Sequence, residues 1–297
     1  MLGNFTLLQM KNNLNYQMLR IRKIEEAIAD RYPEQKMRCP THLSIGQEAI
    51  AVGVCESLRK TDKVFSGHRA HAHYLAKGGN LPRLIAELYG KQGGCCNGRG
   101  GSMHLQDLEA GFIASTSIVG GVIPLAVGCA WAEKLKGTDN VTVVFFGDGC
   151  LEEGVIHEVF NFTSLHNLPI VFVMENNGLA VTTPESARKS NKFDTYGFVE
   201  SYGLQYWSTD GQDVDEVLWV ARTSISRARQ SKPQFIEFQT ERQRVHCGVE
   251  HEYVLKHDPV KPGTAEEELA IQQEIEAAFK FAEESPIPTN PDRGIFK

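Results

Sequence analysis

The sequence predicts an α/β protein in which a mostly parallel central sheet is flanked by helices. Two apolar runs, residues 141–146 and 168–174, are typical of strands buried on both faces, because neither alternates apolar with polar side chains. Between them, residues 154–166 place apolar side chains at helical spacing. A strand, a helix and a second strand in this order form one parallel unit.

Alternating elements are also expected before this unit. A long first helix is predicted over residues 7–31 and a second over 47–58, followed by a short strand at 61–65 and a helix at 81–89. Residues 90–101 contain six glycines and predict an irregular loop, which is either a flexible linker or part of a functional site.

The same alternation continues after the unit. Residues 178–198 are polar and predict a long surface loop of the kind that often carries function. A strand at 204–207, a helix at 214–228 and a strand at 234–239 then follow.

The C-terminal region predicts an acidic helix over residues 264–282, with an apolar stripe that begins at Leu269. We therefore divide the chain into an α/β domain over residues 1–260 and a helical tail over 261–297. A length of 297 residues suffices for one large α/β domain or two small ones.

Composition excludes several classes of partner. The net charge of −6 argues against nucleic acid. The longest apolar stretch, residues 118–132, is too short to span a bilayer, so we expect no membrane contact and a cytoplasmic protein. The seven cysteines form no C-x-x-C pair, so we expect reduced, mostly buried thiols and no zinc site.

Polar side chains follow both apolar strands of the central unit. Asp148 lies in a Gly-Asp-Gly turn after the first strand, and Asn177 ends a Glu-Asn-Asn sequence after the second. The carboxyl ends of neighbouring parallel strands share one edge of a sheet, where α/β proteins bind ligands. A carboxylate and an amide oxygen suit Mg²⁺ bound to a diphosphate, and Gly149 lets backbone N–H groups approach phosphate.

This combination resembles the thiamine diphosphate motif. The chain as a whole resembles the alpha subunit of the thiamine diphosphate-dependent first component of 2-oxo acid dehydrogenase complexes, of the pyruvate, branched-chain and acetoin types. The resemblance covers residues 10–245 and resumes at 281–286. Besides residues 147–177, the matching segments occur in the family's order: His42–Ala49, Arg69–His71, Gly98–His104 and Ile118–Ala126.

The resemblance implies a thiamine diphosphate-binding fold and a decarboxylating, acyl-transferring enzyme with thiamine diphosphate and Mg²⁺ as cofactors. The implied metal ligands are the side chains of Asp148 and Asn177 and the carbonyl of Leu179. The implied cofactor-binding residues are His68, Arg69, Ile118, Val119, Asp148, Gly149, Cys150 and Asn177, with His68 standing where the family usually has an aromatic hydroxyl.

The implied catalytic histidines include one in a loop that departs from the family. His42 matches the first of them, and an imidazole suits proton transfer near neutral pH. The family reads Arg-x-His-Gly-His-Ser in the loop, whereas this chain has Gly248 at the second histidine and Val249 at the serine. His246 fits the first loop histidine, and we expect His42 and His246 to be catalytic; only a shifted loop brings His246 or His251 to the missing position.

The resemblance also implies that this chain forms half of an active site. In the family a beta subunit supplies the pyrimidine-binding domain and the glutamate that activates the cofactor, and this chain has no room for a second such domain. We therefore expect an α2β2 heterotetramer. A lipoyl-bearing transferase is the further partner that the family implies.

Two other functions compete with this assignment. A carboligase or ketol transferase, passing the acyl unit to an aldehyde, ketone or sugar, keeps the cofactor and is favoured by the altered loop. A non-catalytic nucleotide-binding or scaffold subunit has no reason to keep Asp148, Asn177 and Arg69 together, and no G-x-G-x-x-G pattern is present.

Overall fold

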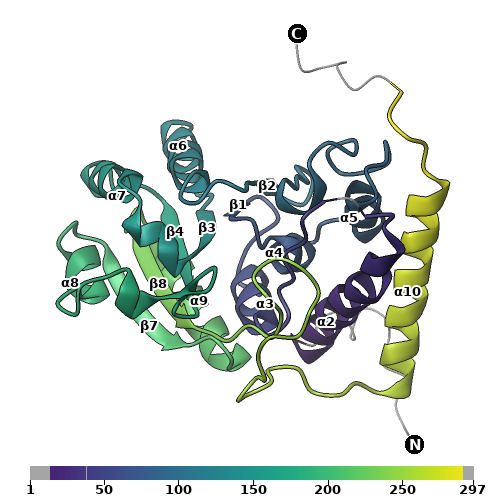
Figure 1. Ribbon diagram of the computed structural model, residues 1–297. Helices are drawn as coiled ribbons and strands as arrows, with labels where there is room; N and C mark the ends of the chain where they lie inside the picture. Colours follow the sequence, from purple (N-terminus) through teal and green to yellow (C-terminus); the bar gives the residue numbers. More distant parts are fainter. Residues whose placement is uncertain (1–13, 38, 290–297) are drawn as a thin grey trace, which may run out of the picture.

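Six parallel strands form the central sheet (Figure 1). The computed structural model describes residues 14–37 and 39–289. Every neighbouring pair of strands in the sheet is parallel, which confirms the predicted fold class. The order across the sheet is β2 (Phe112–Ser115), β1 (Lys63–Ser66), β3 (Thr142–Gly147), β4 (Ile170–Asn176), β8 (Gln234–Gln239) and β7 (Gln205–Asp210).

The central strands are apolar throughout because both faces of the sheet are covered. Val143 and Phe145 of β3 belong to one hydrophobic core, and Val144 and Phe146 belong to the other. Beyond these residues, Gly147 pairs with Glu175 of β4. The residues that follow the two strands therefore leave the sheet at the same edge.

Helices form a layer on each face and a further group at one side (Figure 1). One core contains residues of α6 (Val122–Leu135), α7 (Val155–Leu165) and α8 (Thr195–Glu200). The other contains residues of the remaining helices: α2 (Leu14–Arg31), α3 (Glu48–Glu56), α4 (His71–Ala76), α5 (Leu81–Leu88), α9 (Val214–Ala228) and α10 (Ala265–Glu284).

Helix α10 lies against α2 and α5, with Ile271, Ile275 and Phe279 buried (Figure 1). Leu269 is 59 % exposed, so its assignment to the apolar stripe is wrong. The helix starts with a capping box, in which Thr264 and Glu267 satisfy each other's backbone N–H groups. The division of the chain at residue 260 stays a prediction.

Most of the other predicted elements are present. Helix α9 and strand β8 begin and end at the predicted residues. Part of the predicted first helix, residues 7–13, lies outside the described residues. Helix α4 and strand β2 were not predicted, because each is short and lies within a segment that reads as polar or irregular. No helix in the described ranges is long and apolar enough to cross a membrane.

The glycine-rich segment 90–101 is an anchored loop rather than a flexible linker. The buried carboxylate of Glu87 accepts hydrogen bonds from the backbone N–H groups of Cys96 (2.7 Å), Gly98 (2.9 Å), Gly100 (2.6 Å) and Gly101 (3.2 Å). One side chain on α5 therefore organises the whole segment. The polar loop predicted at 178–198 carries the two-stranded pair β5 (Leu179–Ala180) and β6 (Thr183–Pro184) before α8.

Candidate functional site

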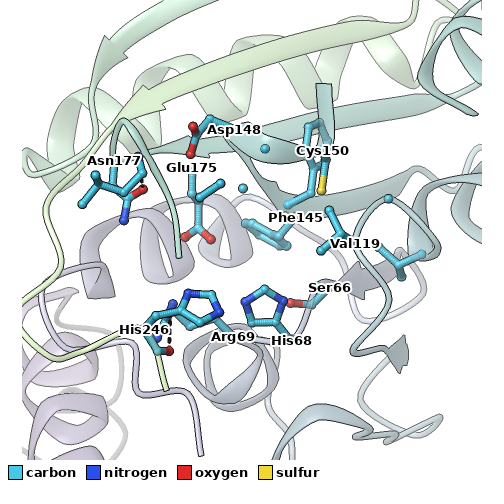
Figure 2. Close-up of a pocket in the computed structure, with 18 of the residues that line it drawn as sticks. Ser66, His68, Arg69, Val119, Phe145, Asp148, Cys150, Glu175, Asn177 and His246 are labelled. Carbon is cyan, nitrogen blue, oxygen red and sulfur yellow. Dashed lines mark hydrogen bonds between the residues drawn. The ribbon is translucent and has the colours of Figure 1, made fainter. Parts of the chain in front are cut away.

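A pocket opens at the point where the strand order reverses. From β1 the chain runs outward to β2 on one side and then returns to β3 on the other side of β1. Such a reversal leaves a crevice at the carboxyl ends of the two strands. The pocket there has about 870 Å³ of empty space, part of which is open to solvent (Figure 2).

The structure brings the predicted site residues together. All of them except His42 line this pocket, namely His68, Arg69, Ile118, Val119, Asp148, Gly149, Cys150, Asn177, Leu179 and His246. His42 packs behind the pocket wall against the rings of His68 and His246. In Figure 2, His68, Arg69 and His246 lie on one side of the pocket and Asp148 and Asn177 on the opposite side.

Asp148 follows β3 directly and is only 1 % exposed. Its carboxylate accepts a hydrogen bond from the guanidinium of Arg188, which also pairs with Glu152. Sequence reasoning missed Arg188, which lies in the polar loop and has no local signal. A buried carboxylate requires a cation or several hydrogen-bond donors, and Arg188 provides the positive charge here.

Asn177 lies beside this carboxylate at the start of the β5–β6 pair. Its side-chain oxygen accepts a hydrogen bond from the backbone N–H of Leu179 (3.1 Å), which forms a turn. The preceding Asn176 is held by Glu237 and by the N–H of Gly178. Asn177 is therefore the asparagine of the pair that faces the pocket.

The turn after β3 requires a small residue at position 149. A Cβ atom on Gly149 would lie 3.2 Å from the Cβ of Ala180, closer than most such contacts. Glycine there allows strand β5 to approach the turn closely, so that Asp148 and Leu179 line the same end of the pocket.

Three histidine rings meet on the opposite side. The ring centroids of His42 lie 4.7 Å from His68 and 5.1 Å from His246, and His68 lies 5.1 Å from His246. Burial and the neighbouring cations lower the pKa of His42 to about 3, and those of His68 and His246 to about 4. All three imidazoles are therefore neutral at pH 7.

Arg69 links the segment that carries His42 to the loop that carries His246. Its guanidinium donates to the carbonyl of Leu43 (2.6 Å) and to that of His246 (3.0 Å). Burial, together with Arg242, lowers the pKa of Arg69 to about 10. Two N–H donors of Arg69, the predicted diphosphate ligand, are thus used within the protein. The roles assigned to the predicted site residues stay predictions.

The 244–251 loop places one of its two histidines at the pocket. His246 lines the pocket, whereas His251 is exposed and its backbone forms an antiparallel bridge with that of Arg244. The N–H of Gly248 donates to the carbonyl of Thr41 (2.9 Å) beside His42. Gly248 has φ +125°, and a Cβ atom there would lie 2.6 Å from Glu250 Oε2. The loop is therefore shaped for glycine where the family has its second histidine.

A network of buried hydrogen bonds supports the histidine side of the pocket. Glu25 of α2 holds His71 (2.7 Å) and accepts from the N–H of Ser44 (2.6 Å), while Ser102 bonds to the other nitrogen of His71 (2.8 Å). Ser102 is fully buried, so this group positions the segment around His42 and is not a nucleophile.

A second network of buried hydrogen bonds forms the floor of the pocket. His73 bonds to Ser66 (2.9 Å) and to Glu175 (3.2 Å) and stacks on Phe145. Sequence reasoning gave Glu175 and His73 no role, although Glu175 belongs to the Glu-Asn-Asn sequence. Both residues line the pocket.

Comparisons with known proteins agree with this site. The family described as "Dehydrogenase E1 component" matches residues 16–252. The alpha subunit of acetoin:2,6-dichlorophenolindophenol oxidoreductase from Bacillus subtilis is 36 % identical, over 93 % of this chain and 89 % of that protein. The pyruvate dehydrogenase E1 component alpha subunit from Rickettsia felis is 32 % identical, over 91 % of this chain and 90 % of that protein.

A solved structure supports the fold alone. Transketolase from Leishmania mexicana superposes with a TM-score of 0.61 at 18 % identity, covering 91 % of this chain. The chain spans less than half of that protein, 46 % of its length. The thiamine diphosphate-binding fold predicted from the sequence is thereby confirmed.

The family match spans most of the chain, and the two relatives named above are themselves alpha subunits. These findings confirm the predicted function over the carboligase and scaffold alternatives. The chain belongs to the dehydrogenase E1 component family, as the alpha subunit of a thiamine diphosphate-dependent 2-oxo acid dehydrogenase.

Proposed function

We propose that this chain binds the diphosphate of its cofactor through Mg²⁺ at the Asp148 side of the pocket and binds a small 2-oxo acid at the histidine side. The observation that carries this proposal is that oxygen ligands and imidazoles face each other across one pocket (Figure 2). The chemistry that thiamine diphosphate supplies when bound is carbanion addition to a carbonyl and uptake of the electron pair left by decarboxylation.

The donor atoms at the Asp148 side fit a hard divalent cation. Asp148 and Asn177 offer side-chain oxygens and Leu179 a backbone carbonyl, and Mg²⁺ prefers oxygen ligands completed by phosphate and water. The Asp148 carboxylate is already paired with a cation, Arg188, so a metal ion would replace that partner. The backbone of Gly149 and Cys150 would lie against the phosphates.

At the histidine side, neutral imidazoles, the buried Arg242 and the partly buried Arg69 favour a carboxylate-bearing substrate. Arg69 and Arg242 line the pocket beside His68 and His246. Their charges attract an anion in a site largely removed from water. We assign proton transfer to His42 and His246, and contact with the cofactor's aminopyrimidine ring to the backbone at Ile118 and Val119.

An exposed apolar face beside the pocket supports a beta-type partner. Leu125, Trp131 and Leu135 of α6 are 57 %, 40 % and 73 % exposed, and the pocket residue Ile118 is 65 % exposed. Large apolar side chains left exposed in this number favour a protein–protein contact. The carboxylates that line the pocket, Asp148 and Glu175, already have partners in this chain.

We infer that the activating glutamate comes from the beta subunit in an α2β2 assembly, for which a lipoyl-bearing transferase is a slow acyl acceptor. The assembly is assigned to the cytoplasm. All seven cysteines of this chain are free thiols, which suits a reducing compartment.

The test combines binding and activity. Calorimetry with the αβ complex should show thiamine diphosphate binding that depends on Mg²⁺. Oxidation of a 2-oxo acid with 2,6-dichlorophenolindophenol should require both subunits. Decarboxylation by the highly purified single chain would refute the shared active site.

A further inference from the structure

We propose that His42, His68 and His246 form a second metal site, selective for a divalent transition metal such as Zn²⁺. A metal bound there blocks substrate binding at the histidine side of the pocket. Nothing in the family match or in the relatives' names assigns this site. The inhibitory part of the proposal rests on the proposed function of the histidine side, whereas the metal site itself rests on geometry alone.

The three rings already have the spacing of a tris-histidine site. One ligand nitrogen from each ring lies within 4.8 Å of the others, and the centroids are 4.7, 5.1 and 5.1 Å apart. With Zn–N bonds of about 2.1 Å and tetrahedral angles, ring centroids would lie on the order of 5 Å apart. Small side-chain rotations would therefore bring the nitrogens onto one ion.

The nitrogens are also free to bind. Nδ1 of His42 is buried and has no hydrogen-bond partner. Within residues 14–37 and 39–289, no hydrogen bond to a ring nitrogen of His68 or His246 is present. A buried polar nitrogen without a partner costs free energy, which a coordinated ion would recover. The cluster opens into the pocket through His68 and His246, which leaves space for water as a fourth ligand.

The two metal sites in the pocket would differ in chemistry. Imidazole nitrogen favours Zn²⁺, Co²⁺ and Ni²⁺, whereas the oxygens at Asp148 and Asn177 favour Mg²⁺. The neutral ring is the form that binds metal, and burial keeps these rings neutral at pH 7. Arg69 and Arg242 oppose a second positive charge nearby, so the site should bind more weakly than a structural zinc site.

A bound ion would remove the two proposed catalytic imidazoles. His42 and His246 would be ligands and could no longer exchange protons with the substrate. The water or anion in the fourth position would occupy the place of the 2-oxo acid. Transition metals should therefore inhibit by competing with the substrate.

The metal site can be tested by Co²⁺ absorption with the full chain in its αβ complex, with Mg²⁺ and thiamine diphosphate in excess to fill the oxygen site. We expect the intense visible band of four-coordinate Co²⁺, and displacement of that band by Zn²⁺. His68→Ala should weaken Co²⁺ binding at least about a hundredfold, since loss of a mere outer partner costs 10–100-fold. His68→Asn keeps polarity and volume, and should lose the band without loss of folding.

His257→Ala is the matched control, because His257 is exposed and lies outside the cluster; it should leave the band unchanged. A band that survives both His68 substitutions, or only the weak spectrum of six-coordinate Co²⁺, would overturn the metal site and leave the proposed function standing. Normal substrate oxidation with Co²⁺ bound at the cluster would overturn the inhibitory role and the assignment of the substrate side together.

Discussion

Arg188 donates a hydrogen bond to the buried carboxylate of Asp148 and also pairs with Glu152. These contacts fix the loop after the β5–β6 pair over the end of the pocket where we place Mg²⁺. The guanidinium neutralises the charge that a metal ion would otherwise neutralise. Metal binding must therefore compete with this ion pair.

Arg188→Gln should strengthen Mg²⁺-dependent binding of thiamine diphosphate by about tenfold, because a hydrogen bond between charged groups contributes about 1.5–3 kcal/mol and no longer has to be broken. Calorimetry of the αβ complex at varied Mg²⁺ measures this effect. Lys189→Gln is the control, since Lys189 belongs to the same loop but pairs with Glu185. Weaker binding in the Arg188 variant would show that Arg188 contacts the bound diphosphate instead.

Asp148→Asn should weaken cofactor binding at fixed Mg²⁺ by at least about tenfold, because an anionic metal ligand is replaced by a neutral one. The comparison is Asp210→Asn, which removes an exposed carboxylate at the end of β7 and should have no effect. Unchanged affinity of the Asp148 variant in the presence of the beta subunit would contradict the metal assignment.

The sequence predicted the elements that have a clear period and the residues that follow them. The burial of β3 and β4 on both faces produced readable apolar runs, and their parallel register then placed Asp148 and Asn177 together. Arg188, Arg242 and Glu87 could not be found in this way. Their roles depend on contacts between segments far apart in the chain, such as the 40-residue separation of Arg188 from Asp148.

The loop around Gly248 could also be predicted only in part. The sequence showed that the family's second histidine is absent, but not which remaining histidine reaches the pocket. The structure selects His246 over His251, because the backbone at Gly248 is bound to Thr41 and turns His246 inward. The family resemblance, not the local pattern, was needed to single out His42.

The stability of the chain should fall as the pH decreases from about 6.5 toward about 4. The folded pKa values of His42, His68 and His246, about 3, 4 and 4, lie below the unfolded value of 6.5, so the unfolded chain binds more protons in this window. Above pH 6.5 their contribution to the pH dependence disappears. Each histidine contributes a slope of up to about 1.4 kcal/mol per pH unit.

Urea unfolding at several pH values measures how the free energy of unfolding changes with pH. Between pH 4.5 and 6.5 this change should be smaller for the double variant His42→Gln/His246→Gln than for the unsubstituted chain. His257→Gln, at an exposed position, should leave the slope unchanged. Equal slopes in all three proteins would mean that the buried rings are protonated in the folded chain.

Glu87→Ala should lower the free energy of unfolding by about 3 kcal/mol or more. The carboxylate accepts four backbone hydrogen bonds from the glycine-rich loop, and the substitution leaves these N–H groups without their partner. Urea unfolding measures the effect, with Glu109→Ala at an exposed site as the control. A loss below about 1 kcal/mol would show that the loop is not anchored by this residue.

Reductive acylation of a lipoyl domain should be at least about a hundredfold slower than oxidation with 2,6-dichlorophenolindophenol, the size of effect that a positioned general acid supplies. Acylation requires a proton at a dithiolane sulfur, and the family resemblance assigns that proton to the histidine that Gly248 replaces. The φ of +125° at this position strains any residue with a side chain, so the backbone there suits glycine and not histidine. His246 lies against His42 and lines the pocket, where we assign it to decarboxylation.

The decisive measurement compares both acceptors with the same αβ complex, and with His42→Gln, His246→Gln and His251→Gln variants of it. We expect the first two substitutions to slow oxidation with the dye, and His251→Gln to slow neither reaction, because His251 is exposed and does not line the pocket. Fast lipoyl acylation that is insensitive to all three substitutions would show that the proton comes from the beta subunit or the lipoyl domain, and that the departure at Gly248 has no catalytic consequence.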